Sequence, residues 1–256
     1  MVELYPELGA FESVNVMPLY DVHIGENIDE KLLLKWREKV LSAPNNFVIV
    51  GGDLVNMALK NSKSDPYGAT MSPMKQMEKA VEFLLPIKDR ILGMVPGNHE
   101  ARMTKDTSVD PMYFIATELG LKHLYSPTTC VLWLKVGSGE RKTPFSMYFY
   151  HGSGGGKSVG GKLSGVAKLE ETLDADVYVA GHTHIPGSFV LGYMRRDVRH
   201  DRYVHVNHYF VNSNDFVIWD NSYAEAWGSR PTAKAIPVIT FYDSPRDIEV
   251  KIGSRL

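Results

Sequence analysis

Cysteine is almost missing from this 256-residue sequence, in which Cys130 is the single example. One thiol cannot form a disulfide within the chain, so a disulfide-stapled scaffold is excluded, and such sparse use of cysteine is typical of a reducing compartment. Cys130 lies in an apolar run, residues 129–133, without a basic neighbour. Because thiols become reactive near positive charge, we predict a structural residue and not a nucleophile.

Two kinds of segment are also lacking. No stretch approaches the ~20 apolar residues of a membrane-spanning helix, and the first residues do not join a charged segment to an apolar one, as a secretion signal does. We therefore expect a cytoplasmic protein with no membrane partner. The net charge is only −2, so no overall positive field indicates nucleic-acid binding, although a local basic patch stays open.

What the sequence does contain is an ordinary globular composition, 44% hydrophobic and 23% charged, in a chain long enough to bury a core. Neither an internal repeat nor a linker divides it, so we expect a single domain over residues 1–256. The first half alternates expected strands and helices, whereas the second half is rich in strands. This order favours an α/β fold in which two sheets pack face to face with helices outside.

The individual elements follow from runs of apolar residues and their spacing. In the helix that begins at Pro73, we expect Met74, Met77, Val81 and Leu84 on the apolar face. The other expected helices are 30–41, 111–119 and 162–173, and the expected strands are 11–20, 47–50, 91–95, 129–136, 145–150, 176–180, 188–194, 203–211, 216–218, 235–242 and 248–252.

The stretch after the strand 91–95 carries residues with metal and proton chemistry. Pro96 lacks an N–H and Gly97 tolerates unusual backbone angles, so the strand should end here. We expect Asn98, His99 and Glu100 on a loop at the carboxyl end of a strand, where open α/β sheets hold their ligands.

Four other expected strands end in similar residues. Carboxylate and amide oxygens suit hard metal ions, and imidazole is a common metal ligand. Just past a strand end, a bend can bring alternate residues toward one centre. Five of the nine histidines lie in these segments, so we predict a metal site. The segments are Asp21-x-His23, Gly52-Asp53-x-x-Asn56, Gly97-Asn98-His99-Glu100, His151-Gly152 and Gly181-His182-Thr183-His184.

Together, these five motifs resemble those of the calcineurin-like metallophosphoesterase superfamily, over residues 12–185 or so. The resemblance implies a four-layer α/β/β/α sandwich of two mixed sheets, with two metal ions at the carboxyl ends of the central strands. It also implies the ligands: Asp21, His23 and His184 for one ion, Asn98, His151 and His182 for the other, and Asp53 between both.

The chemistry of these residues agrees with the resemblance. Mixed nitrogen and oxygen ligands favour Mn²⁺, with Fe, Zn, Co, Ni or Mg as alternatives. Two divalent ions roughly 3.5–4 Å apart clamp a phosphoryl group and activate a bridging hydroxide for in-line attack. His99 is adjacent to the predicted ligand Asn98, so we assign it as general acid to the leaving group.

Asn56 occupies the position that the family uses to orient this histidine. Some members, the Ser/Thr protein phosphatases among them, have aspartate there, followed by Arg-Gly, whereas Met57 and Ala58 follow Asn56. An amide stabilises imidazolium less than a carboxylate does, so we expect a less elevated pKa for His99. Glu100 has two open roles: orienting a ligand or a helix start, or a simple surface or capping position.

Basic residues outside these motifs are weaker candidates for substrate binding. The run 151–158 is similar to a phosphate-binding loop, but the position six residues before Lys157 is His151 and not glycine, so we exclude a nucleotide P-loop. Lys157 is retained as a weak substrate contact. Arg195 and Arg196 belong to a basic run that can meet a nucleic-acid backbone, although a solvated loop is the more common role of such runs.

We therefore predict a binuclear metal-dependent phosphoesterase that hydrolyses a phosphodiester, with a DNA nuclease as the leading specific interpretation and nucleic acid as a candidate partner. The Asp-x-His opening resembles nucleases and phosphodiesterases, but protein phosphatases share it. The alternative is a phosphomonoesterase acting on phosphoprotein or a small phosphorylated metabolite. A non-catalytic scaffold is disfavoured because Asp53, Asn98 and His99 are all present. Nothing in the sequence supports a homodimer.

Overall fold

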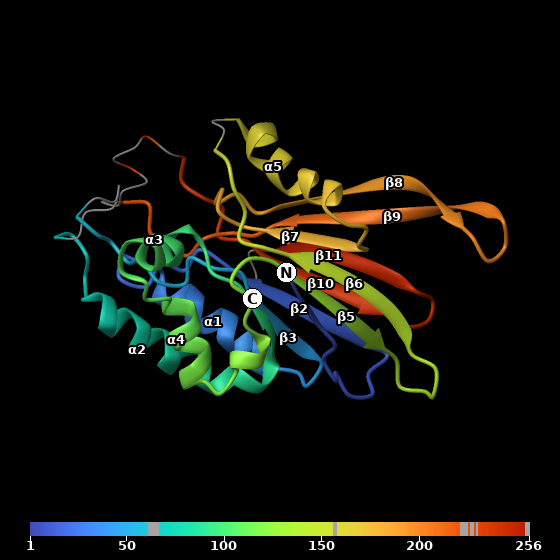
Figure 1. The fold of residues 1–256 in the computed structure, drawn as a ribbon, viewed down its shortest axis with the longest axis horizontal. Coiled ribbons are helices and arrows are strands. Elements are labelled where there is room, and N and C mark those ends of the chain that lie inside the picture. The colour runs from blue at the N-terminus through green and yellow to red at the C-terminus, as the bar shows by residue number, and fades with distance from the viewer. Residues whose placement is uncertain (61–66, 156–157, 221–224, 226–227, 229, 254–256) are drawn as a thin grey trace.

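The structure is a computed structural model that describes the chain except residues 61–66, 156–157, 221–224, 226–227, 229 and 254–256. Two mixed β-sheets lie face to face and carry helices on their outer faces, so the predicted α/β/β/α architecture is confirmed (Figure 1). Within the described residues, none of the helices combines the length and the apolar character needed to cross a membrane.

The first sheet has the strand order β11-β10-β2-β3-β4. Its strands β2 (Ser13–Leu19), β3 (Asn46–Val50) and β4 (Ile91–Met94) are parallel to one another. Two antiparallel strands, β10 (Ile236–Tyr242) and β11 (Asp247–Gly253), extend the sheet beyond β2. The outer face is covered by α1 (Glu30–Leu41), α2 (Pro73–Leu84), the 3₁₀ helix η1 (Leu85–Arg90) and α4 (Pro111–Glu118).

Strand β3 shows how one strand serves two cores. All of its residues are buried. Because successive side chains of a strand point to opposite faces, Val48 and Val50 pack with the helices, whereas Phe47 and Ile49 belong to the core between the sheets. A short continuous apolar run is what a parallel strand covered on both sides requires.

The second sheet has the order β1-β5-β6-β7-β9-β8. The strands β6, β7 and β9 run parallel, so their carboxyl ends meet at one edge. On the outer face, Val166 of α5 (Val159–Ala167) packs against Tyr148 and Tyr178. The strands of this sheet are β1 (Val2–Leu4), β5 (Cys130–Val136), β6 (Thr143–Phe149), β7 (Val177–Ala180), β8 (Gly187–Asp197) and β9 (Arg202–Asn212).

The predicted bounds of one helix and the predicted structural role of Cys130 are confirmed. Helix α1 has the predicted bounds, and the Leu32 N–H donates to the carboxylate of Asp29 at 3.0 Å, which caps its first turn. Leu33, Trp36 and Val40 form its buried stripe. Cys130 is buried in β5, and burial raises the pKa of its thiol to about 12, as fits a structural residue.

The expectation of a loop at residues 98–100 is wrong. Asn98 begins helix α3 (Asn98–Thr107), and Gly97 is its N-terminal cap. The Gly97 N–H donates to the carboxylate of Glu100 at 2.8 Å, so the third residue of the helix satisfies the cap. The strand does end before Pro96, but the chain turns directly into a helix.

The expected strand 216–218 is also wrong. Val217 makes only an isolated bridge to Ile28. The Phe216 N–H donates to the Asp21 carbonyl at 3.1 Å, and the Ile218 N–H donates to the Asn27 carbonyl at 2.9 Å. This segment therefore uses its backbone hydrogen bonds to fasten the loop that follows β2.

Three smaller differences concern element ends and faces. Met74 is 49% exposed, because the buried stripe of α2 runs through Gln76, Met77 and Ala80 instead. The expected helix 162–173 begins earlier, where the Gly161 N–H donates to the Ser158 hydroxyl at 3.1 Å, and ends in the 3₁₀ helix η3 (Lys168–Glu171). The three-residue strand β1 was too short to predict, and it is fixed by pairing with β5.

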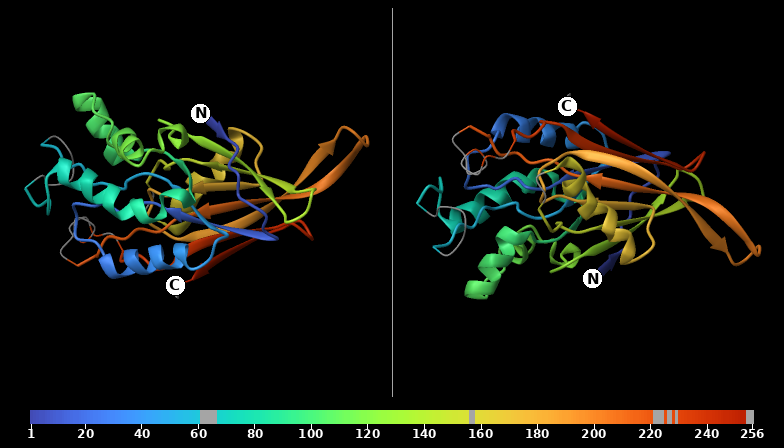
Figure 2. Two further views of the ribbon diagram at one scale, coloured as in Figure 1. Left: turned by 90° about the horizontal axis from the view of Figure 1, so that it is seen from below. Right: turned by 90° about the horizontal axis from the view of Figure 1, so that it is seen from above.

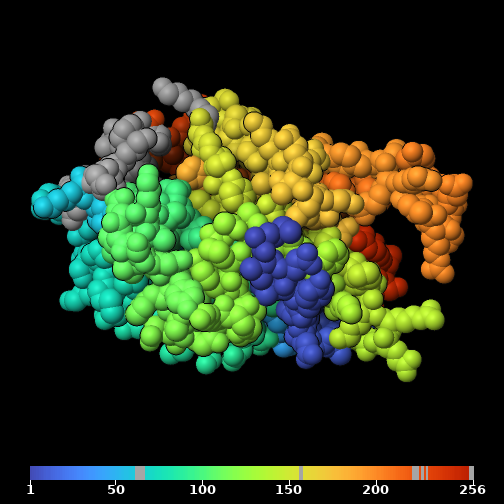
Figure 3. Space-filling view, viewed as in Figure 1, coloured from blue at the N-terminus to red at the C-terminus, as the bar shows by residue number. Residues whose placement is uncertain are grey.

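The hairpin β8–β9 extends far beyond the rest of the sandwich. In both views of Figure 2 it leaves the molecule at the end opposite the helices of the first sheet. In the space-filling view its tip projects from the body of the molecule (Figure 3). The carboxyl ends of β2, β3, β4, β6, β7 and β9 therefore lie well away from this tip.

Candidate metal centre

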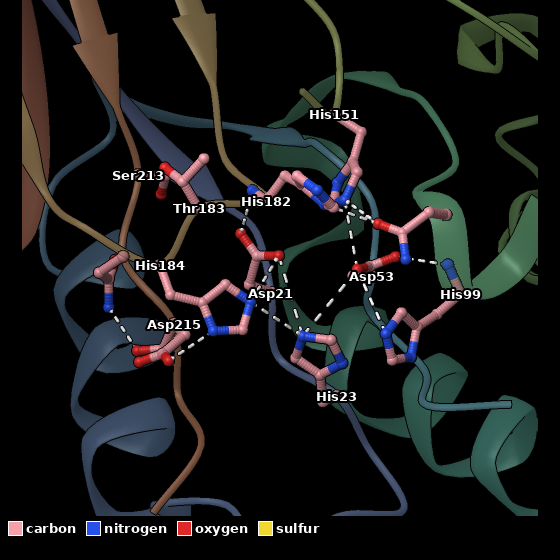
Figure 4. A network of polar contacts seen from close by, with 12 residues as sticks. Asp21, His23, Asp53, His99, His151, His182, Thr183, His184, Ser213 and Asp215 are labelled. Carbon is pink, nitrogen blue, oxygen red and sulfur yellow. Dashed lines mark hydrogen bonds and ion pairs between the residues drawn. The ribbon is translucent and has the colours of Figure 1, made fainter. Parts of the chain in front are cut away.

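The segments that follow six strands converge at one edge of the sandwich (Figure 4). The structure brings together all the residues predicted as ligands, and it adds Asp215 from the segment after β9. The predicted ligands are Asp21, His23, Asp53, Asn98, His151, His182 and His184, whose mutual contacts are described below.

The backbone of this edge is unusual. Among the described residues, eight non-glycine residues have positive φ, and six of them lie in the segments that build the cluster. Left-handed backbone is costly for residues with a side chain and gathers at functional sites. The six are Asp21, His23, Asp53, Met57, His182 and His184, with φ between 46° and 65°. These bends turn alternate residues such as Asp21 and His23 toward one centre, as the sequence predicted.

Close backbone contact between neighbouring segments holds these bends. The Asp21 N–H donates to the Gly52 carbonyl at 3.1 Å, and the His23 N–H donates to the Asp53 carbonyl at 2.9 Å. A Cβ atom at Gly97 would lie 2.1 Å from the Asp53 carboxylate, so only glycine fits there. The segments after β2, β3 and β4 therefore form one packed unit.

The first group of donors consists of Asp21, His23 and His184. The two imidazole Nε2 atoms are 3.4 Å apart, and the Asp21 Oδ1 atom is 3.3 Å from Nε2 of His184 and 3.8 Å from Nε2 of His23. The Nδ1 atom of His184 lies 2.8 Å from a carboxylate oxygen of Asp215. Because Asp215 accepts the Nδ1 proton, the lone pair of His184 is on Nε2 and faces the group.

The second group consists of Asp53, Asn98, His151 and His182. The Asn98 Oδ1 atom is 3.0 Å from Nε2 of His151 and 2.7 Å from Nδ1 of His182. The Nδ1 atom of His151 lies 2.9 Å from the Gly51 carbonyl, so its Nε2 atom faces the group. This arrangement places two imidazoles and an amide oxygen around one point.

Asp53 connects the two groups. Its Oδ1 atom accepts a hydrogen bond from the His99 N–H at 2.7 Å, which fixes the carboxylate. Its Oδ2 atom lies 3.2 Å from Nε2 of His151 and 4.0 Å from Nε2 of His23. One oxygen therefore faces both groups, as the predicted bridging position requires.

The donor atoms fit divalent cations. Ligands about 2.1 Å from one ion lie roughly 3–3.5 Å from one another, close to the distances within each group. The buried Asp21 Oδ1 atom accepts no hydrogen bond from any described residue, so it is available as a ligand. The sets are mixed nitrogen and oxygen, which suits borderline and hard divalent metals.

The charges of the cluster shift its pKa values in opposite directions. Burial lowers the pKa of His23 well below its usual value, and His99 adds to this effect. In Asp53 burial acts to raise the pKa, but His151 and His99 outweigh it and hold the pKa well below its usual range. Burial lowers the pKa of His151, but Asp53 outweighs it and raises the pKa to about 9. Metal binding at His151 therefore competes with protonation of its ring.

His99 lies beside the cluster and contacts Asn56, as predicted. Its Nδ1 atom is 2.8 Å from the Asn56 carbonyl and 3.0 Å from the Asn56 Oδ1 atom. Its Nε2 atom faces Oδ2 of Asp53 at 3.8 Å. Burial lowers the pKa of His99 and Asp53 opposes this shift, so the expectation that the pKa is not strongly elevated agrees with the structure.

Glu100 has a buried structural role, and the surface reading is wrong. One carboxylate oxygen accepts the N–H groups of Asp53 at 2.9 Å and Gly97 at 2.8 Å, and the other accepts the Val55 N–H at 3.1 Å. Burial, with the nearby Asp53, raises the pKa of Glu100 to about 7. Glu100 thus caps α3 and holds the Asp53 segment at the same time.

A cavity of about 300 Å³ opens onto the cluster and continues past it. Lys162 and Arg230 bring positive charge to its wall, and Trp219 brings an aromatic surface. The Lys162 ammonium also donates to the Thr183 carbonyl at 3.2 Å. These three residues, like Asp215, lie outside the strand-end motifs that carried the sequence prediction.

One residue predicted as a weak substrate contact, Lys157, lies outside the described residues. The other two, both arginines, are not at this cavity. Arg195 and Arg196 lie on β8, where Arg195 bonds to Asp174 and Arg196 is 3.5 Å from Asp201. Neither arginine lines the cavity. Asp215 was not predicted. Its only signal in the sequence is the polar run 212–215 after an expected strand, and this run lacks the glycine and histidine of the other motifs.

Comparisons with known proteins identify a family for most of the chain. Residues 21–186 match the family described as calcineurin-like phosphoesterase. A search of curated proteins found no match. Among solved structures, YfcE, a phosphoesterase from E. coli, is similar at 16% sequence identity with a TM-score of 0.41, over 93% of this chain and 98% of that one.

Proposed function

The chain belongs to the calcineurin-like phosphoesterase family, and we propose that it hydrolyses a phosphodiester with two divalent metal ions, Mn²⁺ in the first place, held at the strand-end cluster. Phosphoester hydrolysis with divalent metal is the common activity of the family. The observation that carries the proposal is the position of Asp53, whose Oδ2 atom faces both groups of donors.

In this proposal Asp21, His23 and His184 hold one ion, and Asn98, His151 and His182 hold the other. Bound divalent ions supply charge stabilisation for a phosphoryl group and lower the pKa of water. The protein contributes orientation: Asp215 and the Gly51 carbonyl fix the rings of His184 and His151, so their Nε2 atoms face inward.

His99 is proposed to take up a proton from solvent on Nε2 and to pass it to the leaving oxygen. Its Nδ1 atom is engaged by Asn56, so Nε2 is the ring atom that can exchange a proton with a substrate. That atom faces the cluster beside Asp53. A positioned acid matters most for a leaving group that departs poorly as an anion.

The cavity supports a diester over a monoester. Beyond the cluster it continues between Lys162, Trp219 and Arg230, which provides room for a second substituent on phosphorus. The two cationic side chains also suit a nucleic-acid strand, which makes a nuclease the leading specific form of the proposal. The alternative is a phosphomonoesterase acting on a small metabolite or phosphoprotein, whose substrate would occupy less of the cavity of about 300 Å³.

We also propose that residues 1–256 act as one domain. The strands β10 and β11, late in the chain, extend the sheet formed by β2, β3 and β4. The first strand, β1, extends the other sheet. Both sheets therefore draw on segments that lie far apart in the sequence.

The decisive test is a matched hydrolysis assay with Mn²⁺. It compares bis(p-nitrophenyl) phosphate, p-nitrophenyl phosphate, single-stranded DNA and double-stranded DNA, each with and without chelator. Chelator-sensitive cleavage of the diester, with or without DNA cleavage, is the expected result. Preference for the monoester would replace the proposal by the phosphatase alternative, and no cleavage of any substrate would count against hydrolysis of simple phosphoesters.

A further inference from the structure

Glu26 lies behind the pair formed by His99 and Asn56. Its Oε1 atom accepts a hydrogen bond from the Asn56 side-chain amide at 2.6 Å. We propose that Glu26 is a positioning residue for His99: it fixes the amide of Asn56 so that this amide can accept the ring proton. The proposal rests on the phosphoester hydrolysis proposed above.

The hydrogen-bonding groups of Asn56 and Glu26 fix the orientation of the Asn56 amide. The Asn56 side chain has a carbonyl oxygen on one side and an NH₂ group on the other. A carboxylate only accepts hydrogen bonds, so the NH₂ group faces Glu26 and the Oδ1 atom faces Nδ1 of His99 at 3.0 Å. With the amide turned over, its NH₂ group would oppose the Nδ1 proton of His99.

The oriented amide thereby favours one tautomer of His99, the one that the backbone carbonyl of Asn56 also favours. Its Nδ1 proton has two acceptors, the carbonyl and the Oδ1 atom of Asn56. The Nε2 atom is left to face the cluster, where a substrate would bind. Glu26 thus acts indirectly: it positions Asn56, and Asn56 positions His99.

The backbone fixes the distance between Glu26 and Asn56. The Glu26 N–H donates to the His23 carbonyl at 2.9 Å, and the Asn56 N–H donates to the Ile24 carbonyl at 2.9 Å. On the other side, the Met57 N–H donates to the side chain of the buried Gln76 at 2.9 Å. The contact between the two side chains is therefore built into adjoining segments.

Glu26 is separate from the donors of the cluster. It belongs to none of the groups of described residues that can hold a metal ion. Its side chain is half-buried, whereas Asn56 is fully buried. Replacing the carboxylate therefore removes a constraint on Asn56 without removing a ligand.

The test compares Glu26→Ala, Glu26→Gln, Asn56→Ala and the double variant Glu26→Ala/Asn56→Ala. Each is assayed on bis(p-nitrophenyl) phosphate and on diphenyl phosphate, whose leaving group is poorer. We expect Glu26→Ala to lower kcat about tenfold for diphenyl phosphate and much less for the nitrophenyl diester, with KM and bound manganese unchanged. Glu26→Gln should restore most of the loss, because its amide oxygen accepts the same hydrogen bond.

In the Asn56→Ala background, Glu26→Ala should have no further effect, because its partner is already gone. The matched control is Glu30→Ala, which removes a nearby carboxylate that pairs with Lys79 and does not contact Asn56. Equal losses on both substrates, or additive losses in the double variant, would overturn the proposal.

A second readout does not depend on activity. Imidazole ¹⁵N NMR of the full-length, metal-free protein, with His99→Gln for assignment, reports which ring nitrogen of His99 carries the proton. The Nδ1-protonated form should dominate in the wild type, and the Nε2-protonated form should increase in Glu26→Ala. An unchanged spectrum would reject the role of Glu26. If the wild type cleaves no phosphoester but the spectrum does change, the proposed function fails and the positioning contact stands.

Discussion

The two ends of the second sheet use ionisable residues in opposite ways. At the carboxyl ends of β7 and β9, His184 and Asp215 are largely buried and belong to a cluster drawn from six segments. Toward the tip of the β8–β9 hairpin, ionisable residues pair with near neighbours in the chain: the exposed Arg202 and His200 lie 3.4 Å and 2.8 Å from the half-buried Asp197. The side chains of a continuous charged run form ion pairs with one another locally. Charged side chains dispersed over several strand ends come together only when the fold is complete.

Two histidines of the second sheet show the same difference between its ends. Both His184 and His208 lie beside a carboxylate, Asp215 at 2.8 Å and Asp174 at 3.1 Å. The second ring nitrogen of His184 faces other donors in the cluster. His208 is packed against the ring of Tyr193, with 4.4 Å between the ring centroids. A histidine–carboxylate pair therefore indicates a metal ligand only where the far ring nitrogen meets further donors.

The largest effect is expected from Asp53→Ala. Removing the oxygen that faces both groups should abolish binding of two metal ions and cost several kcal/mol of transition-state stabilisation, or roughly a thousandfold in kcat/KM. Metal analysis and kinetics on the best phosphoester measure this. Arg202→Ala in the hairpin is the control and should retain full metal content. If Asp53→Ala still bound two ions tightly, Asp53 would not be a bridging ligand.

His99→Ala should come next. We expect about a hundredfold loss of kcat with a poor leaving group and a smaller loss with p-nitrophenolate, because the acid is needed most where the leaving oxygen is most basic. Manganese content should equal that of the wild type. Loss of metal from this variant would instead show that His99 is a ligand. The Nε2 atom of His99 lies 3.8 Å from the Asp53 carboxylate, so the same measurement tests this alternative.

Asp215→Asn tests the first histidine pair. The amide accepts a weaker hydrogen bond from His184 Nδ1, so metal affinity should fall about 10–100-fold, as for other carboxylates behind a ligating histidine. Asp174→Asn makes the same change beside His208 and should leave metal affinity unaltered. Titration of each chelator-treated protein with Mn²⁺ measures its metal affinity. Equal affinities for the wild type, Asp215→Asn and Asp174→Asn would contradict the proposed difference between the two histidine–carboxylate pairs.

The smallest effect concerns acid stability through His208. Burial lowers the pKa of His208, Arg195 adds to this, and Asp174 opposes it. The unfolded state therefore takes up the proton first, so stability is lost as the pH falls below about 6.5, toward the folded-state pKa. His208→Gln should lose less stability than the wild type between pH 7.5 and 5.5, measured by urea unfolding with chelator present. His205→Gln, exposed on the same strand, should behave like the wild type.

Much of the fold and of the cluster could be predicted because local sequence and tertiary structure agree there. Short, β-branched apolar runs such as Phe47–Val50 favour strands covered on both faces, and the polar residues after parallel strands meet at one edge. The start of α3 could not be predicted in this way, because Glu100 caps Gly97 from inside the helix while also holding Asp53. Asp215 and Glu26 were missed because each acts through a partner distant in sequence.

Strand β2 has consequences for how the molecule is made. It lies between β3, which follows soon after it, and β10, which begins only at Ile236. The donors around Asp53 are likewise spread from Asp21 to His184, with Asp215 behind them. A nascent chain therefore cannot complete the centre and the sheet that supports it until β10 has been synthesised. We expect metal to be acquired after that point, which makes metal content a readout of completed folding.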